Sequence, residues 1–241
     1  ADGAVWASSP CTDFSTANAA PRDRSSLTAT LARHVLDVSP AWLLFENVPR
    51  ARNSAEFAEL VRSLRAGGYA VDHRIVNALG AGVPQTRRRL FLVAARGADQ
   101  RVARAALRRF EELCSGEAVT MRQRFDAAAV ACPTPYIYLQ SCDERRRKSI
   151  FTLDGPAPTV RGCVRPLRPT YPFPPRDDTH DRALVFAAAV EHLAALQCFP
   201  SDFRWCTGKT ASARCIGNAV PPPMAERLAH AIAGDQASTA S

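Results

Sequence analysis

The sequence predicts an α/β fold with a mostly parallel sheet that is covered by helices. Short apolar runs have the length of buried strands, and they fall at residues 5–7, 42–45, 70–76 and 89–95. Segments whose apolar residues have helical spacing stand between the first three runs. Strands that alternate with helices are typical of parallel sheets, in which ligands bind at the carboxyl ends of the strands.

Two of the expected strands end in chemically active residues. The run 5–7 leads into Ser8-Ser9-Pro10-Cys11, which places Cys11 on a loop after a strand. The run 42–45 leads into Glu46-Asn47-Val48, which places Glu46 at a second strand end. Both side chains therefore occupy the edge at which such a sheet binds ligands.

Caps and breakers bound the expected helices. Ser25-Ser26 precede the first helix, which extends to Val38. Asn53 and Glu56 resemble a capping box for the second helix, which ends at Gly67-Gly68. The strand over 70–76 follows, and a loop with two glycines and a proline connects it to the strand over 89–95.

Beyond residue 115 the pattern changes. Prolines cluster between Pro133 and Pro175 with basic residues among them, which indicates an irregular region, and helix returns at about 183–197 and 224–233. We therefore expect four parts, namely a core over 1–115, a short irregular region over 116–180, a return to the core over 181–234 and a disordered tail over 235–241.

Composition predicts a globular protein that binds a polyanion. Of the 241 residues, 46% are hydrophobic, which is enough for a sizeable core. The formal charge of +8 favours nucleic acid as a partner, although a solvated basic surface has the same composition. The eight cysteines include no C-x-x-C pair, so no zinc or redox pair has its usual spacing. With neither a long apolar stretch nor a signal pattern, we expect a cytoplasmic protein without a membrane partner.

Six short motifs stand in order along the chain. Three are Ser9-Pro10-Cys11-Thr12-Asp13-Phe14-Ser15, Glu46-Asn47-Val48 and Gln85-Thr86-Arg87-Arg88-Arg89. The others are Pro156-Ala157-Pro158-Thr159-Val160, Leu196-Gln197-Cys198-Phe199-Pro200-Ser201-Asp202-Phe203 and Gly217-Asn218-Ala219-Val220-Pro221. Together they resemble six segments of DNA cytosine-C5 methyltransferases, which stand in the same order: P-C-Q-x-F-S, E-N-V, Q-x-R-x-R, P-x-P-T-V/I, L-Q-x-F-P-x-x-F and G-N-A-V-P. The resemblance extends from about Ala4 to Ile232, and six motifs in order argue against chance.

The resemblance implies specific chemistry. C5 of cytosine is a poor nucleophile until a group adds at C6, and Cys11 would be that group, on a loop whose arginines lower a thiol pKa. Glu46 would bond N3 and the exocyclic amine of the base. Arg87 and Arg89 match arginines that hold the base carbonyl and nearby backbone, and strand alternation would turn both to one face, away from Arg88. An inert buried cysteine, a loop cap and a solvated basic run are the structural alternatives.

The resemblance also implies a cofactor and a fold type. S-adenosylmethionine would be the methyl donor, in a Rossmann-like fold of the S-adenosylmethionine-dependent methyltransferase type, with Pro10, Asn218 and Val220 on the cofactor side. The family's Gly-rich turn does not stand in the sequence, so the fold is expected to be incomplete at its N-terminus. A truncated product, a second chain that supplies the missing part, and a degenerate paralogue are the three explanations.

Double-stranded DNA is the implied substrate, with the target cytosine flipped into the site. The residues expected to contact DNA are Ser15, Arg22, Arg24, Gln85, Arg161 and Arg165. The segment 116–180 would take the place of the target-recognition region, in an enzyme of the prokaryotic or phage restriction-modification type.

Three departures from the family pattern are visible. Thr12 replaces the usual Gln, Ser9 replaces a usual first Pro, and Glu191-His192 replace an Arg-Glu pair. One alternative is therefore an inactive or split-subunit chain that binds DNA and needs a partner for the cofactor. A tRNA cytosine-C5 methyltransferase is a second alternative, whose Cys-Phe-Thr signature is absent from the sequence. A cysteine hydrolase with a histidine base is a third, which the spacing of the five histidines does not support.

Overall fold

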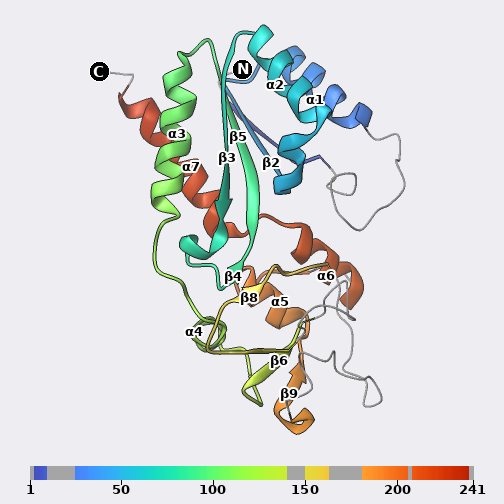
Figure 1. Cartoon of the computed structure of the whole chain (residues 1–241). Helices are drawn as coiled ribbons and strands as arrows, with labels where there is room; N and C mark the ends of the chain where they lie inside the picture. The colour runs from blue at the N-terminus through green and yellow to red at the C-terminus, as the bar shows by residue number, and fades with distance from the viewer. Residues whose placement is uncertain (1–2, 10–24, 140–149, 163–180, 206–207, 239–241) are drawn as a thin grey trace. The chain divides into compact units, whose positions relative to one another are not determined.

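The structure of the chain is a computed structural model that describes residues 3–9, 25–139, 150–162, 181–205 and 208–238 (Figure 1). The chain divides into two compact units. Unit 1 consists of Ala1–Asn77, Arg88–Ser115 and Glu226–Ser241, and unit 2 of Ala78–Arg87 and Gly116–Ala225. The chain therefore leaves unit 1 twice and returns to it twice.

Unit 1 contains a sheet in the order β1-β2-β5-β3. Its strands are β1 (Ala4–Ala7), β2 (Trp42–Asn47), β3 (Tyr69–Asn77) and β5 (Arg88–Arg96). β1 pairs with β2 in parallel, whereas β5 is antiparallel to both β2 and β3. The predicted α/β class is confirmed, but the described sheet is mixed rather than mostly parallel. The segment 78–87 between β3 and β5 is too short for the crossover that parallel neighbours need, so the two strands pair antiparallel.

Helices cover both faces of this sheet (Figure 1). α1 (Ser25–Val38) and α2 (Ala55–Ala66) lie on one face, and α3 (Gln100–Leu113) lies on the other, next to the later turns of α7 (Pro222–Ser238). The core on the α2 side includes Phe45, Phe57, Leu60, Leu64, Val71 and Leu92. A sheet with both faces covered buries every position of β2, so the charged residue at its end is also buried.

Local signals explain most boundaries in unit 1. The N-cap of α2 is Ser54, whose side chain accepts a hydrogen bond from the Phe57 amide. The expected cap Asn53 instead ends a 3-10 helix, Pro49–Asn53, which begins at a proline, a residue suited to a first helical turn. α2 stops before Gly67 as predicted, and Gly68 adopts a left-handed φ of 82°.

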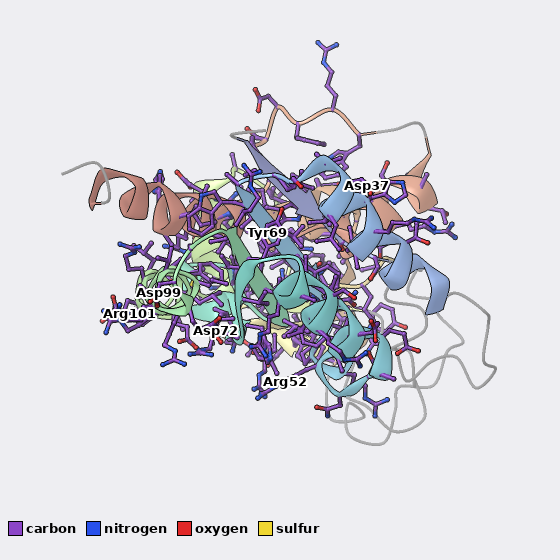
Figure 2. All side chains as sticks on the ribbon, turned by 90° about the horizontal axis from the view of Figure 1, so that it is seen from above. Asp37, Arg52, Tyr69, Asp72, Asp99 and Arg101 are labelled. Carbon is purple, nitrogen blue, oxygen red and sulfur yellow. The ribbon has the colours of Figure 1, made fainter. Side chains whose placement is uncertain are left out.

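α3 was not predicted from the sequence. Asp99 caps this helix, and Arg101 bonds back to the same carboxylate at its first turn (Figure 2). Its buried residues Ala103, Ala106, Leu107 and Phe110 have helical spacing, so the signal was present in the sequence.

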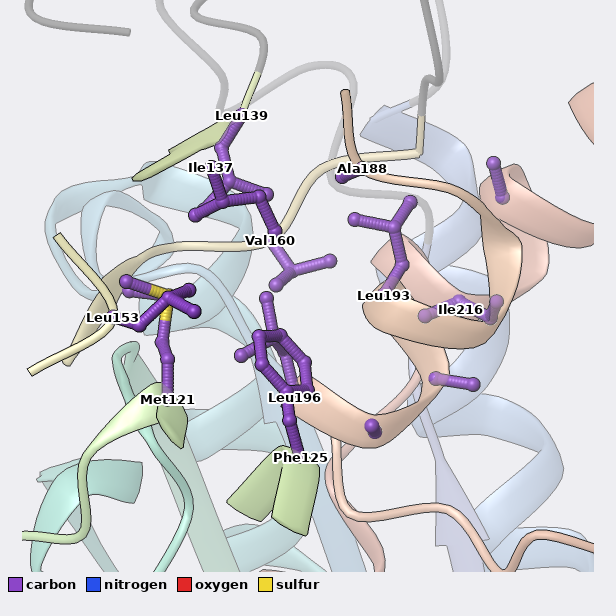
Figure 3. Close-up of a cluster of buried hydrophobic side chains, with 14 residues drawn as sticks. Met121, Phe125, Ile137, Leu139, Leu153, Val160, Ala188, Leu193, Leu196 and Ile216 are labelled. Carbon is purple, nitrogen blue, oxygen red and sulfur yellow. The ribbon is translucent and has the colours of Figure 1, made fainter. Parts of the chain in front are cut away.

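Unit 2 is built from short elements around its own core. The helices are α4 (Met121–Ala127), α5 (Val190–Leu196) and α6 (Lys209–Asn218), with 3-10 turns at Ala78–Ala81 and Arg182–Leu184. β4 (Gln85–Thr86) pairs with β8 (Ala157–Pro158), and a second sheet has the order β7 (Ile150–Thr152), β6 (Tyr136–Tyr138), β9 (Val185–Ala187). Figure 3 shows the core, which includes Met121, Phe125, Ile137, Leu153, Leu196 and Ile216.

Two expected helices of the C-terminal part differ in extent. The segment 183–197 contains a 3-10 turn, β9 and α5 rather than one helix, because Val185 and Phe186 pair with β6. A β-branched and an aromatic residue in sequence favour a strand at that point. α7 begins at Pro222 and continues to Ser238, four residues past the expected end of the ordered chain.

Candidate active site

In unit 1 the buried Glu46 forms an ion pair with Arg89, which is half-buried. Glu46 is 4% exposed at the carboxyl end of β2, where its register partner on β5 is Phe91. Arg89 lies two residues before Phe91 and therefore on the same side of the strand. Its Nε lies 3.1 Å from Oε1 of Glu46. A buried carboxylate needs such a partner, because leaving water without one is costly.

The segment that follows β1 contacts two residues at the end of β2, Glu46 and Asn47. The parallel register pairs Ala7 with Phe45, so Ser8 and Ser9 stand beside Glu46 and Asn47. The Ser8 hydroxyl donates to Oε2 of Glu46 at 3.1 Å. The Asn47 amide donates to Oγ of Ser9 at 3.0 Å and to its carbonyl at 3.2 Å. The residues that precede Pro10-Cys11 are therefore fastened to the E-N-V motif.

Arg87 takes a different position from the one predicted. It is fully buried in unit 2, where Nη1 donates to the Val160 carbonyl at 3.1 Å. Nη2 donates to the carbonyls of Gly217 and Ala219, both at 2.9 Å. Arg87 and Arg89 were expected to hold the base carbonyl and nearby backbone, and Arg87 holds backbone: a guanidinium bonded to three backbone carbonyls of its own unit is a structural clamp.

Gln85 is likewise buried rather than presented to DNA. Its Nε2 donates to the Leu196 carbonyl at 2.8 Å and to Oε1 of Gln197 at 2.7 Å, and its Oε1 accepts from the Val160 amide at 3.0 Å. Gln197 in turn donates to the Ile216 carbonyl at 2.6 Å. A side chain whose amide is bonded at both ends and has no exposed surface does not face a ligand, so the expected DNA contact of Gln85 is corrected.

The glycine of the G-N-A-V-P motif permits a close approach of two backbones in unit 2. A Cβ on Gly217 would overlap the backbone of Arg161 and lie 2.6 Å from Cα of Gly162. A Cβ on Gly162 would in turn lie 2.8 Å from Cα of Arg214. Neither distance is compatible with a side chain, so α6 and the segment around Gly162 require glycine at both positions.

The remaining predicted site residues are only partly within the described chain. Asn218 is the last residue of α6 and is exposed, while Val220 and Arg161 are half-buried. Residues outside the described part are Pro10, Cys11, Ser15, Arg22, Arg24 and Arg165. Chain connectivity alone places Cys11 directly after Pro10, two residues beyond Ser9.

Sequence reasoning missed three residues that the structure brings into these networks, namely Ser8, Gln197 and Gly162. The parallel pairing of the first two strands could have found Ser8, because it is the register neighbour of Glu46. Gln197 was visible within the L-Q motif, but its partner Ile216 belongs to a different segment.

Cys114 is a further titratable group of unit 1, and its side chain is buried. Burial raises the pKa of the Cys114 thiol to about 11, against a smaller opposite effect of Arg227, so this thiol stays protonated near neutral pH. Within the described residues, no group of side chains has the arrangement of a metal site. None of the described helices is both long and apolar enough to cross a membrane.

Comparisons with known proteins identify the family. The model of the C-5 cytosine-specific DNA methylase family matches residues 4–127 and 178–234. The type II methyltransferase M.HgiDI of Herpetosiphon aurantiacus is 34% identical over 228 residues, which cover 92% of this chain and 70% of the relative. M.HindV of Haemophilus influenzae is 30% identical over 228 residues, which cover 92% and 72%.

Solved structures show the same fold. The Dnmt2 methyltransferase of S. pombe has a TM-score of 0.65 at 14% identity, covering 97% of this chain and 78% of that one. A DNA modification methyltransferase encoded within an E. coli prophage has a TM-score of 0.62 at 19% identity, covering 96% and 78%. These likenesses confirm the expected Rossmann-like methyltransferase fold. Given the family match over most of its length and the two relatives at 30% identity or more, the chain belongs to the C-5 cytosine-specific DNA methylase family, the DNA (cytosine-5-)-methyltransferases.

Proposed function

We propose that this chain methylates C5 of a cytosine flipped out of double-stranded DNA, through a covalent adduct between Cys11 and C6 of the base. One observation carries the proposal: the Glu46–Arg89 pair lies beside Ser8, three residues before Cys11. A carboxyl and a guanidinium thus meet at the carboxyl ends of two parallel strands, where sheets of this class bind ligands, and Cys11 follows Ser8 by three residues in the sequence.

The Cys11 thiolate adds to C6 and forms a C–S bond. The electron pair of the C5–C6 double bond moves to C5, and N3 of the ring takes a proton from the Glu46 carboxyl. C5 would then take the methyl group from the sulfonium of S-adenosylmethionine, whose S–CH3 bond would break to leave a neutral thioether. Loss of the C5 proton to water and return of the N3 proton to the Glu46 carboxylate would restore the C5–C6 double bond and expel the thiolate from C6, so that Cys11 and Glu46 return to their starting states.

Arg89 has two tasks in this scheme. Its guanidinium has five N–H donors in a fixed fork, so one side chain can hold Glu46 and also reach the carbonyl of the base. By holding Oε1 through Nε, it turns the carboxyl in one direction before the base arrives. Orientation in advance lowers the entropy cost of the reacting geometry.

S-adenosylmethionine supplies an electrophilic methyl group to enzymes of this kind. We propose Pro10, Asn218 and Val220 as the residues of this chain on the cofactor side. In support, Asn218 is exposed at the end of α6, while the carbonyls on either side of it, those of Gly217 and Ala219, are fixed by Arg87. An exposed amide on a fixed backbone suits the orientation of a polar ligand.

Contacts with DNA are proposed for the basic and hydroxyl side chains that the buried network does not use. They are Ser15, Arg22, Arg24, Arg161 and Arg165. Arginine and serine side chains bond phosphate oxygens and set the register of a protein on the duplex. The cytosine must leave the stack because the target atoms are inaccessible within it.

A second candidate function is supported by the edge of the sheet in unit 1. Among the described strands, β1 pairs only with β2, and Trp6 on β1 is 39% exposed. An open strand edge with an exposed aromatic residue can accept a further strand. We therefore also consider an assembly in which another chain pairs with β1 and completes the cofactor side. Calorimetric titration of S-adenosylmethionine would support this assembly if binding required an added chain.

The covalent step is testable on DNA that contains 5-fluorocytosine, in which fluorine at C5 blocks the final proton loss. We expect the wild-type chain with S-adenosylmethionine to form an adduct that survives denaturing electrophoresis. Cys11→Ser should form none, because an alcohol is a much poorer nucleophile than a thiolate. Cys215→Ser, which changes an exposed thiol, is the matched control and should trap DNA normally. Adduct formation by Cys11→Ser would remove Cys11 from this role.

A further inference from the structure

We propose that Ser8 is a positioning residue for Glu46, which it holds through the second carboxylate oxygen. This inference rests on the proposed function for its role in catalysis, but its geometry stands alone. Ser8 Oγ donates to Oε2 at 3.1 Å, while Arg89 Nε lies 3.1 Å from Oε1. Each oxygen of Glu46 therefore has a different donor.

Two donors on two oxygens restrict the carboxylate more than one donor does. The terminal torsion of a glutamate is broad and roughly two-fold, so a carboxylate held at one oxygen can still rotate. The Ser8 hydroxyl opposes that rotation from the side of β1, and Arg89 opposes it from the side of β5. A carboxylate oxygen accepts more than one hydrogen bond, so this arrangement is compatible with a base that bonds the same group.

The Ser8 hydroxyl is a suitable partner for Glu46 because the Glu46 carboxyl changes its protonation state in the proposed reaction. A serine hydroxyl is both a donor and an acceptor, and its hydrogen rotates to suit the partner. Ser8 can donate to the Glu46 carboxylate and accept from the carboxylic acid, whereas Arg89 can only donate. Ser8 therefore gives Glu46 a partner before and after the proton moves to N3. Alanine at position 8 has no hydroxyl, so it would remove this partner of Glu46.

The neighbouring residue Ser9 is also bonded to β2, which holds the backbone around Ser8. Asn47 donates to both Oγ and the carbonyl of Ser9, one residue along each strand. The register of β1 and β2 thus continues past Ala7, where the strand itself ends. This pairing holds Ser8 opposite Glu46.

The first experiment measures Glu46 directly in the full chain without DNA or cofactor. The carboxyl ¹³C signal of Glu46, assigned by its loss in Glu46→Gln, is followed against pH in the wild type, Ser8→Ala and Ser8→Thr. A donor to the charged form favours ionisation, so Ser8→Ala should lower the ionisation constant of Glu46 about threefold to tenfold, and Ser8→Thr should restore it. An unchanged titration in Ser8→Ala would overturn the proposal.

The matched control is a hydroxyl with the same kind of partner elsewhere in unit 1. Ser63 on α2 donates to Oε1 of Glu59 at 3.0 Å. Ser63→Ala should leave the titration of Glu46 at its wild-type position. A shift of equal size in Ser63→Ala would show that the effect is not specific to Ser8 and would also overturn the proposal.

The second experiment measures methyl transfer to DNA. We expect Ser8→Ala to lower kcat about tenfold with little change in the KM for DNA, and to change the pH dependence of kcat, with recovery in Ser8→Thr. Wild-type kcat at every pH in Ser8→Ala would overturn the catalytic role of Ser8. If the wild-type chain transferred no methyl group, the proposed function would fail, and the carboxyl titration would still decide for or against Ser8.

Discussion

In unit 1 the buried Glu46 bonds to the side chains of Arg89 and Ser8, whereas in unit 2 the buried Arg87 bonds to backbone carbonyls. Side-chain partners can rotate when a base enters. Backbone partners cannot move without displacing the segments to which they belong. The difference separates a site that can rearrange during a reaction from a network that holds a fold.

Both arrangements draw on one run of five residues, Gln85-Thr86-Arg87-Arg88-Arg89. Gln85 and Arg87 enter unit 2, and Arg89 enters unit 1, because the chain passes from one unit to the other after Arg87. One motif thus contributes a structural clamp and a residue of the candidate site.

The largest effect is expected from Arg87→Met. The change removes the Arg87 donor from the buried Val160 and Gly217 carbonyls, while the Ala219 carbonyl keeps its bond from Gln197, so the free energy of unfolding should fall by about 3–5 kcal/mol. Urea denaturation measures it. The neighbouring exposed residue provides the control, since Arg88→Met should change stability by less than about 0.5 kcal/mol. Equal urea denaturation curves for the two variants would contradict the role of Arg87 as a structural clamp.

Arg89→Lys should affect the reaction more than the fold. Lysine keeps the positive charge near Glu46 but lacks the planar fork, so kcat/KM for methyl transfer should fall about 100-fold, or about 2.7 kcal/mol. The melting temperature should stay within a few degrees of the wild type. A large fall in melting temperature with little change in kcat/KM would mean that Arg89, like Arg87, is a structural clamp.

Gln197→Leu should destabilise unit 2 less than Arg87→Met does. It removes the side-chain donor to the Ile216 and Ala219 carbonyls and one acceptor of Gln85. Ile216 keeps a backbone donor, and Gln85 keeps its bond to the Leu196 carbonyl. We expect a loss of about 1–3 kcal/mol, measured by urea denaturation. A loss as large as that of Arg87→Met would mean that the two amides and the guanidinium act as one unit.

The smallest effect concerns His73 on β3 in unit 1. Burial, and then the charge of Arg52, lower the pKa of this imidazole, so the folded state holds it neutral. Its contribution to stability is complete above the unfolded pKa of about 6.5 and is lost as pH falls from that value through the lower pKa of the folded state, because the unfolded state takes up the proton first.

The measurement for His73 is the urea midpoint at pH 7.5 and at pH 5.5. The decrease between them should be smaller in His73→Gln than in the wild type. His34→Gln, which changes an exposed histidine of α1, should leave the decrease unchanged. If His73→Gln lost as much stability as the wild type on acidification, burial of this imidazole would not explain the acid sensitivity.

The sequence predicted the ends of β1 and β2 because both are local apolar runs with polar residues after them. That was enough to place Glu46 at a strand end. It could not place Arg87, because the partners Val160 and Gly217 are 73 and 130 residues away. The alternation that was expected to align Arg87 with Arg89 needs one continuous strand, and the structure has two, β4 and β5, with Arg87 between them.

The mixed sheet could not be predicted for a related reason. Periodicity indicates that a strand is buried, but not the direction of its neighbour. Direction depends here on the length of the connection from β3 to β5, which passes through another unit.

The close backbone approach at Gly217 and Gly162 sets a rule for exchanging segments of unit 2 between enzymes of this family. A chimaera whose junction falls between these glycines would join a foreign backbone to one that leaves no room for a Cβ. Donor and acceptor sequences must therefore both have glycine at these two positions, or the exchanged block must contain the pair. The two positions therefore act as one steric unit, even though more than fifty residues separate them along the chain.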